Sequence, residues 1–389
     1  MPLPRRAFLG RSAGVLCGLN APGLLARAAA GATGPGETVL VVVQLSGGND
    51  GLNCVVPYSD PAYRAARPTL AVPAADVLKI DGEVGFHPDL RGFADLLDAG
   101  ELAVVRGVGY PNPDRSHFVS TDVWHRAAVP GEHGRVRTGW LGRTLPMLGG
   151  PGTGLHVGGG AAPGALLGDA GPAPSVRDAA AYRLRGGFVP SAQSSAGLLG
   201  QVEAATAAAA ASSDRVRRAA GDPAGAADYP ASGLAERLEL VARLIAADLP
   251  ERVFFTELPG FDTHAVQPAT HPGLLAELGG AGAAFFADLR ARGHADRVVL
   301  MAQSEFGRRV AENGSTGTDH GAAGPVFLAG PRVRAGLLGA APSLTDLDGG
   351  DLRWRVDFRT VYAALLGGWL GVDAAAVLGG RFEPAPVLA

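Results

Sequence analysis

Apolar runs that alternate with helical stretches most constrain how this chain can fold. Residues 37–45 (ETVLVVVQL), 102–108, 251–258 and 296–303 are rich in valine, leucine and phenylalanine, and residues 234–248 have helical apolar spacing. Continuous apolar runs of this length are typical of strands that are buried on both faces of a sheet. Strand–helix–strand repeats favour parallel connections with helices covering the sheet. The sequence therefore predicts an α/β fold with a mostly parallel central sheet and helices on both faces.

Length and composition fit one large domain. The chain has 389 residues, and its hydrophobic content of 47% is enough for a sizeable core. Between about 135 and 232 the periodicity weakens, and glycine-rich turns lead into an alanine-rich helical segment. We interpret this stretch as a cap or insertion within a single α/β domain that spans residues 37–389.

The N-terminus has the pattern of an export signal. Arg5 and Arg6 precede Ala-Phe-Leu, a modest apolar stretch follows, and residues 26–28 (Ala-Arg-Ala) suit a signal peptidase. We therefore expect a twin-arginine signal peptide over residues 1–30, the twin-arginine export machinery as a partner, and a periplasmic or extracellular location. A frayed basic arm is the alternative. Gly18 and Pro22 interrupt the apolar stretch, so it is a poor permanent membrane span.

Charge and cysteine content argue against nucleic-acid binding and against an intramolecular disulfide. The formal net charge is −3, and no basic patch is interleaved with aromatic residues, so the sequence gives no reason to expect a nucleic-acid partner. Cys17 lies within the predicted signal, which leaves Cys54 alone in the mature chain. An intramolecular disulfide is therefore excluded after export.

Titratable side chains gather in loops that follow the predicted strands. In parallel sheets the carboxyl ends of strands meet at one edge, where ligands bind. Mixed carboxylate and imidazole ligands suit Zn²⁺, Mn²⁺ or iron, and carboxylate-dominated sets suit Mg²⁺ or Ca²⁺. A divalent metal is therefore the expected cofactor, and its candidate ligands and neighbours are Asp50, Ser116 with His117, Asp262 with His264, Glu305, and Asp319 with His320.

Several longer motifs together resemble one known family. The segments VVVQLSGGNDGLNCVVPY, RSHFVSTDVW, GFDTHAVQ, SEFGRRVAENGSTGTDHGAAGPVF and VDFRTVYAALLGGWLGVD resemble the exported proteins grouped as domain of unknown function 1501. That family is similar to the alkaline phosphatase and sulfatase superfamily. The resemblance covers nearly the whole chain and implies an alkaline-phosphatase-like fold, with a mainly parallel sheet between helices.

The superfamily resemblance also implies roles for individual residues. Its metal pair has the spacing Asp-x-x-x-His, whereas this chain has Asp-x-His, and His271 is an alternative second imidazole. One-metal and two-metal sites both remain open. The implied metal ligands are Asp50, Asp262, His264, Glu305, Asp319 and His320.

Three further residues are candidates for catalysis. Ser116 occupies the place of the superfamily nucleophile at a helix start, although it could simply cap that helix. His117 could act as a base or a ligand, or be solvated. Arg308 could steady an anionic substrate or pair with acids at the surface.

The predicted function is that of an exported metal-dependent hydrolase of phosphate or sulfate esters with a serine nucleophile. Its partner would be a small anionic ester substrate. The alternative is a catalytically degenerate exported binding or assembly module that retains the fold and part of the metal site. Its partner would be another exported protein.

Overall fold

A single large sheet forms the centre of the domain. A computed structural model describes residues 37–389 except 130, 132–135, 150–152, 170 and 178–226, so the predicted signal peptide lies outside the described residues. The sheet has nine strands in the order β13-β5-β12-β11-β1-β10-β6-β9, with β16 beside β5. Strand β12 is antiparallel to β11 and β5, and the other pairings are parallel. The predicted α/β fold with a mostly parallel sheet is confirmed.

Strand β1 lies at the centre of this sheet. Leu40 is in register with Val253 of β10 on one side and with Val299 of β11 on the other. The strands of the sheet are β1 (Val39–Ser46), β5 (Leu102–Gly109), β6 (Gly154–Val157), β9 (Ser175–Val176), β10 (Val253–Pro259), β11 (Val298–Gln303), β12 (Gly324–Ala329), β13 (Gly336–Leu338) and β16 (Val356–Asp357).

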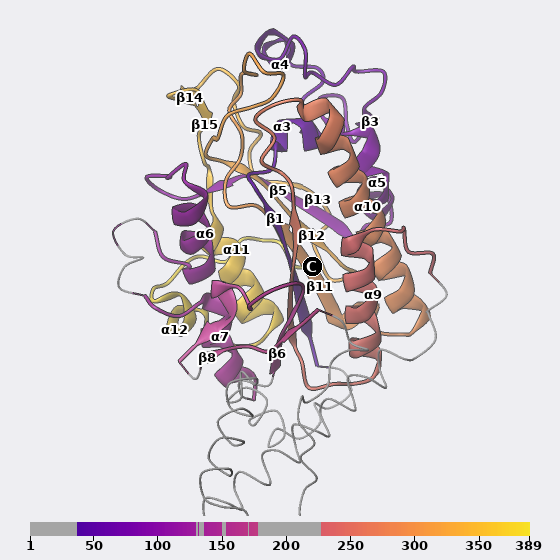
Figure 1. The fold of residues 1–389 in the computed structure, drawn as a ribbon, viewed down its shortest axis with the longest axis vertical. Coiled ribbons are helices and arrows are strands. Elements are labelled where there is room, and N and C mark those ends of the chain that lie inside the picture. The colour runs from indigo at the N-terminus through magenta and orange to yellow at the C-terminus, as the bar shows by residue number, and fades with distance from the viewer. Residues whose placement is uncertain (1–36, 130, 132–135, 150–152, 170, 178–226) are drawn as a thin grey trace, which may run out of the picture.

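Helices cover both faces of the sheet (Figure 1). Because successive strand residues point to opposite faces, β1 contributes to two cores. Val41 and Val43 are buried in the core with α5, α9 and α10, whereas Leu40 and Val42 are buried in the core with α6, α7, α11 and α12. The helices are α5 (Arg91–Asp98), α6 (His117–Arg126), α7 (Trp140–Thr144), α9 (Gly233–Ala246), α10 (Gln267–Ala291), α11 (Phe358–Ala363) and α12 (Ala374–Leu378).

Part of the predicted cap or insertion belongs to the main fold instead. Strand β6 pairs with β10, and β9 pairs with β6, so both extend the central sheet. In α7, the Trp140 ring stacks on Tyr362 with 3.9 Å between ring centroids. The apolar residues of this weakly periodic stretch therefore fill the domain core, and the remainder of the prediction, residues 178–226, lies outside the described residues.

A smaller layer covers the end of the sheet at which β1 stops (Figure 1). It has its own apolar core, which includes Leu52, Tyr63 and Leu344. Across the described residues, no helix is both long and apolar enough to cross a bilayer. The elements of this layer are α3 (Gly51–Cys54), β2 (Val55–Val56), α4 (Pro61–Ala66), β3 (Leu78–Lys79), β4 (Gly85–Phe86), β14 (Leu347–Asp348) and β15 (Asp351–Leu352); the hairpin β7 (Leu167–Gly168) and β8 (Gly171–Pro172) lies elsewhere.

Three buried histidines predict a loss of stability in acid. Burial lowers the pKa of His125, His156 and His271 from 6.5 to about 4 in each case. Between these values the unfolded chain binds protons that the folded protein does not, so acid favours unfolding. We expect the free energy of unfolding to fall as the pH decreases from 6.5 to 4. Each histidine contributes up to about 1.4 kcal/mol per pH unit, which urea unfolding at a series of pH values measures.

His156→Asn provides the control for this pH dependence. The Nδ1 atom of His156 contacts Ser175 Oγ at 2.8 Å, and asparagine keeps a polar group there without titrating in this range. We expect this variant to be less stable at neutral pH but to lose stability less steeply in acid. An unchanged slope would mean that His156 is not a buried neutral group.

Candidate metal centre

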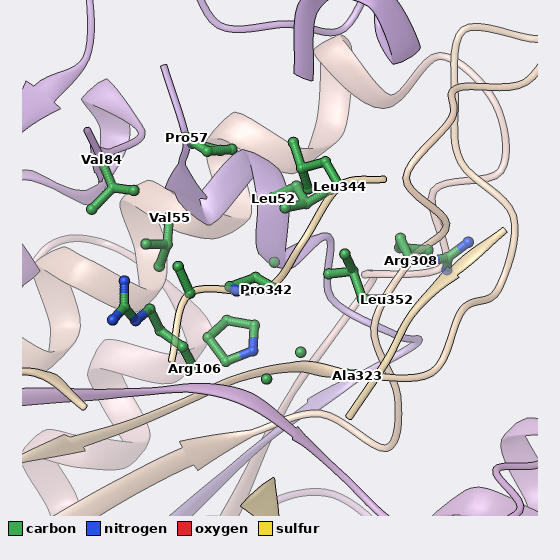
Figure 2. A pocket seen from close by; sticks show the side chains of 15 residues that line it. Leu52, Val55, Pro57, Val84, Arg106, Arg308, Ala323, Pro342, Leu344 and Leu352 are labelled. Atoms are coloured by element: carbon green, nitrogen blue, oxygen red, sulfur yellow. The ribbon is translucent and has the colours of Figure 1, made fainter. Parts of the chain in front are cut away.

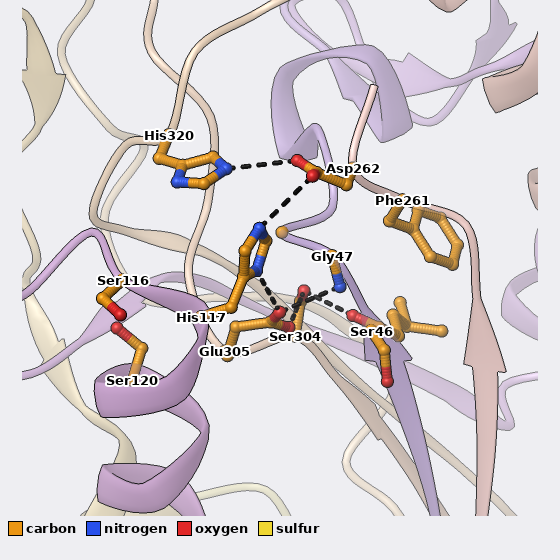
Figure 3. Close-up of polar contacts among 12 residues, drawn as sticks. Ser46, Gly47, Ser116, His117, Ser120, Phe261, Asp262, Ser304, Glu305 and His320 are labelled. Carbon is orange, nitrogen blue, oxygen red and sulfur yellow. Dashed lines mark hydrogen bonds and ion pairs between the residues drawn. The ribbon is translucent and has the colours of Figure 1, made fainter. Parts of the chain in front are cut away.

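Side chains from three distant parts of the chain meet beyond the ends of the central strands. His117 is the first residue of α6, after β5. Asp262 and His264 follow β10, and His320 lies in the connection between β11 and β12. Figure 3 shows His117, Asp262 and His320 pointing toward one another. One ligand atom from each of these three lies within 4.8 Å of the others.

The imidazole nitrogens of three histidines lie close to the Asp262 carboxylate. The Nε2 atoms of His264 and His320 each lie 3.1 Å from Asp262 Oδ1, and they lie 2.8 Å from each other. His117 Nε2 lies 3.5 Å from Asp262 Oδ2. Three imidazoles therefore present the same type of nitrogen to one carboxylate.

The opposite ring nitrogens determine which tautomer each histidine adopts. His320 Nδ1 lies 2.7 Å from the carbonyl oxygen of Arg115, which can only accept, so Nδ1 carries the proton. His264 Nδ1 faces Asp319 Oδ1 at 3.4 Å, and His117 Nδ1 faces Glu305 Oε1 at 2.9 Å, so both donate as well. In the neutral form of each ring, Nε2 then holds a lone pair.

This arrangement fits a divalent metal ion. Two imidazole lone pairs 2.8 Å apart repel each other unless a positive charge lies between them. Neutral imidazoles with a carboxylate are ligands of Zn²⁺, Mn²⁺ and iron, and a metal-binding histidine usually donates its other N–H to a carboxylate or carbonyl. Asp262, His264 and His320 would therefore hold the ion, with His117 facing it. Asp319, which the sequence predicted as a metal ligand, would instead orient the His264 ring through the contact with its Nδ1.

His117 is oriented by a buried glutamate. The Glu305 side chain is 3% exposed, and its Oε1 accepts hydrogen bonds from His117 Nδ1 and from the backbone N–H of Gly47 at 2.9 Å each. The ring of Phe306 packs against His117 and His320, with centroids 4.9 and 4.6 Å away. Glu305 therefore acts through His117, whereas the sequence predicted that it would bind metal directly.

Arg308 positions Asp262 and does not face a substrate. Its side chain is fully buried, and its Nη2 donates to Asp262 Oδ1 at 2.7 Å. Partial burial opposes ionisation of Asp262, but the hydrogen bond and the positive charge of Arg308 outweigh it and lower the pKa of Asp262 to about 2. The predicted contact with an anionic substrate is corrected here, because the guanidinium already donates to the carbonyls of Gly47, Gly48, Phe261 and Thr318.

Asp50 does not join the cluster. Its carboxylate is fully buried, and its Oδ2 accepts from Arg67 Nη1 and from Gln267 Nε2 at 2.6 Å each. Burial opposes ionisation of Asp50, but the Arg67 charge and hydrogen bond outweigh it and lower the pKa of the carboxyl group. The prediction that Asp50 binds metal is corrected, because an internal ion pair with Arg67 holds this carboxylate. Nothing in the sequence around Arg67 pointed to that partner.

Ser116 stands beside the cluster rather than in it. It is the N-cap residue of α6, and its side chain makes no capping hydrogen bond. In Figure 3 its hydroxyl lies on the Ser120 side of the helix start, away from Asp262. The next residue, His117, is the one that enters the site.

A glycine permits the close approach of two of these loops. Gly47 has φ +121°, and a Cβ atom there would lie 2.3 Å from the backbone nitrogen of Asp262. Gly47→Ala must therefore shift the loop that carries Asp262. We expect metal affinity to fall about 10- to 100-fold, as when an orienting partner of a ligand is lost. Titration with Zn²⁺ against a chelating dye measures this.

Gly82→Ala is the matched control, because a Cβ at Gly82 would have no neighbour within 4 Å. It should bind metal like the unmodified protein. Equal metal affinity in the Gly47 and Gly82 variants would show that the close approach does not set the position of Asp262.

Comparison with known sequences agrees with the resemblance for the motifs in the second half of the chain. Residues 178–366 match the sequence model of the family described as "Protein of unknown function (DUF1501)". Among curated proteins, none matches the chain.

The solved structures to which this chain is similar include three enzymes with low sequence identity. The lipoteichoic acid synthase LtaP from Listeria monocytogenes is 9% identical, with 95% of this chain and 82% of that chain covered and a TM-score of 0.40. Murine ectonucleotide pyrophosphatase/phosphodiesterase 5 is 11% identical, with 87% and 96% covered and a TM-score of 0.39. The PsFucS1 sulfatase from Pseudoalteromonas sp. is 12% identical, with 88% and 70% covered and a TM-score of 0.34.

Proposed function

We propose that this chain is an exported, divalent-metal-dependent hydrolase of phosphate or sulfate esters. The observation that carries the proposal is the convergence of three imidazole lone pairs on the Asp262 carboxylate. A bound divalent ion there would polarise an ester oxygen and lower the pKa of a bound water from about 15.7 to about 7. The substrate class rests on the resemblance of the sequence motifs to the alkaline phosphatase and sulfatase superfamily.

Within this proposal, His117 is the general base. Glu305 Oε1 accepts a hydrogen bond from His117 Nδ1–H, so Nε2 is free to take a proton from an attacking water. The buried Glu305 carboxylate then stabilises the imidazolium that forms. This assignment replaces the predicted serine nucleophile, since the Ser116 hydroxyl stands apart from the cluster.

Two adjacent alanine variants separate the two nucleophiles. We expect His117→Ala to lower the hydrolysis of p-nitrophenyl phosphate or sulfate by about 10²- to 10⁴-fold, the usual contribution of a positioned base. Ser116→Ala, the matched control, should keep most of the activity. If Ser116→Ala abolishes turnover while His117→Ala does not, a serine nucleophile operates instead.

The same preparations test the alternative function. Metal bound by the unmodified protein, with no turnover of either ester, would support the exported binding or assembly module. Absence of both metal and turnover across a panel of divalent ions would contradict both functions.

We further propose export by the twin-arginine route, supported by Arg5 and Arg6 ahead of the apolar stretch. Replacing both arginines by lysine should leave the unprocessed chain in the cytoplasm. Normal processing of that variant would contradict the route.

A further inference from the structure

A pocket separate from the metal centre lies beside α3, the helix that follows the loop after β1. It is open to solvent and lies between α3, β2, β5 and the segment that precedes β14, with about 60 Å³ in which the centre of a water molecule fits. Figure 2 shows its apolar walls. None of the side chains that converge at the metal centre lines it. Its apolar lining includes Leu52, Val55, Val84, Pro325, Pro342 and Leu344.

One cationic group in this lining has no anionic partner among the described residues. Arg106, on β5, donates from Nη2 to the carbonyl of Gly339 at 2.6 Å, while its Nε is buried without a hydrogen-bond partner in the described part of the chain. Asp81 is not a hydrogen-bond partner of Arg106. Its Oδ1 accepts hydrogen bonds from the backbone N–H groups of Val84 and Glu83, which lower the pKa of Asp81, and the Arg106 charge adds to that effect. The rest of the guanidinium is only partly buried, and its positive charge has no carboxylate partner in the described part of the chain, so the site favours an anion.

The other arginine of the lining cannot take this role. Arg308 touches the cavity, but its guanidinium donates to Asp262 and to backbone carbonyls, as described above. Arg106 is thus the cation that is available to a ligand. Apolar walls with a single charged group are the usual composition of a small-molecule site.

We propose that this cavity binds an aliphatic monocarboxylate. The carboxylate is held by the Arg106 guanidinium in charge-assisted hydrogen bonds, and the alkyl chain lies against the leucine, valine and proline side chains. Because none of the proposed metal ligands lines the cavity, binding at this site can be tested apart from the proposed hydrolase function.

Calorimetric titration of the full mature protein with butanoate, hexanoate, octanoate and 1-octanol tests the site. We expect affinity to rise about fourfold for each added methylene, since each buried methylene contributes about 0.8 kcal/mol. Octanoate should bind at least about tenfold more tightly than 1-octanol, which has the same chain without the charge.

Arg106→Gln should remove the preference for octanoate over 1-octanol. The matched control is Arg355→Gln, because Arg355 lies nearby but pairs with Asp346 at the surface; it should leave the preference unchanged. His320→Ala should bind octanoate normally even if it loses metal, which separates this site from the proposed hydrolase.

Three results would overturn the proposal: an affinity that does not depend on chain length, octanoate binding that Arg106→Gln leaves intact, or octanoate binding that His320→Ala abolishes. The chain-length series uses the unmodified protein, so it decides the matter even if Arg106→Gln does not fold.

Discussion

Replacing His320 by alanine should remove the bound metal and the hydrolytic activity together. His320 Nε2 lies 3.1 Å from Asp262 and 2.8 Å from His264, so its loss removes one of the three ligands that we assign to the ion. The effect should exceed the about 10- to 100-fold loss that follows removal of an outer partner of a ligand. Elemental analysis of the purified protein and p-nitrophenyl ester hydrolysis measure the two losses.

His294→Ala is the control for this experiment. His294 lies before β11 and accepts from Arg297 Nε at 3.2 Å, far in sequence from the cluster loops. It should keep both metal and activity. Normal metal content in the His320 variant would refute the assigned ligand set, whereas lost metal with unaltered activity would refute the hydrolytic role of the ion.

Replacing Arg67 by methionine should destabilise the protein by about 3–5 kcal/mol, the usual cost of leaving one charge of a buried pair alone. Both side chains of the Arg67–Asp50 pair are fully buried, with 2.6 Å between Arg67 Nη1 and Asp50 Oδ2. Arg67 also donates to the carbonyls of Arg309 and Val310, which adds to the loss. Urea unfolding at neutral pH measures the change.

A double-mutant cycle isolates the charge effect. In the Arg67→Met background, Asp50→Asn should restore part of the stability, because the amide leaves no uncompensated charge. Asp50→Asn alone should keep metal bound, whereas the superfamily resemblance implies that it would lose metal. Loss of metal from Asp50→Asn would return Asp50 to the ligand set.

The sequence located most of the candidate site because its residues sit in loops after recognisable strands. Asp262 and His264 follow the apolar run that forms β10, and Glu305 follows the run that forms β11. Parallel strands bring such loops to one edge, so local patterns were enough to group them. The same reasoning placed Asp50 there too, since it could not show that Arg67 would turn this carboxylate into an internal ion pair.

The sequence did not predict which of two adjacent side chains would point into the site. Ser116 and His117 are neighbours at the start of α6, and only the packing of that helix decides which one faces Asp262. Arg308 and Arg309 are likewise adjacent, yet the Arg308 side chain is fully buried while the Arg309 side chain is 36% exposed.

By itself, then, the sequence determined the α/β class, the mostly parallel sheet and the loops that form the candidate site, because apolar periodicity and the succession of strands and helices along the chain are local properties. The tertiary structure alone decided which of those side chains converge and which are held by buried partners. Contacts such as His264 with His320 or Asp50 with Arg67 depend on how helices and loops pack. Arg106 belongs with the second group, since the burial of its Nε and its place in the apolar pocket depend on how the smaller layer packs on the sheet.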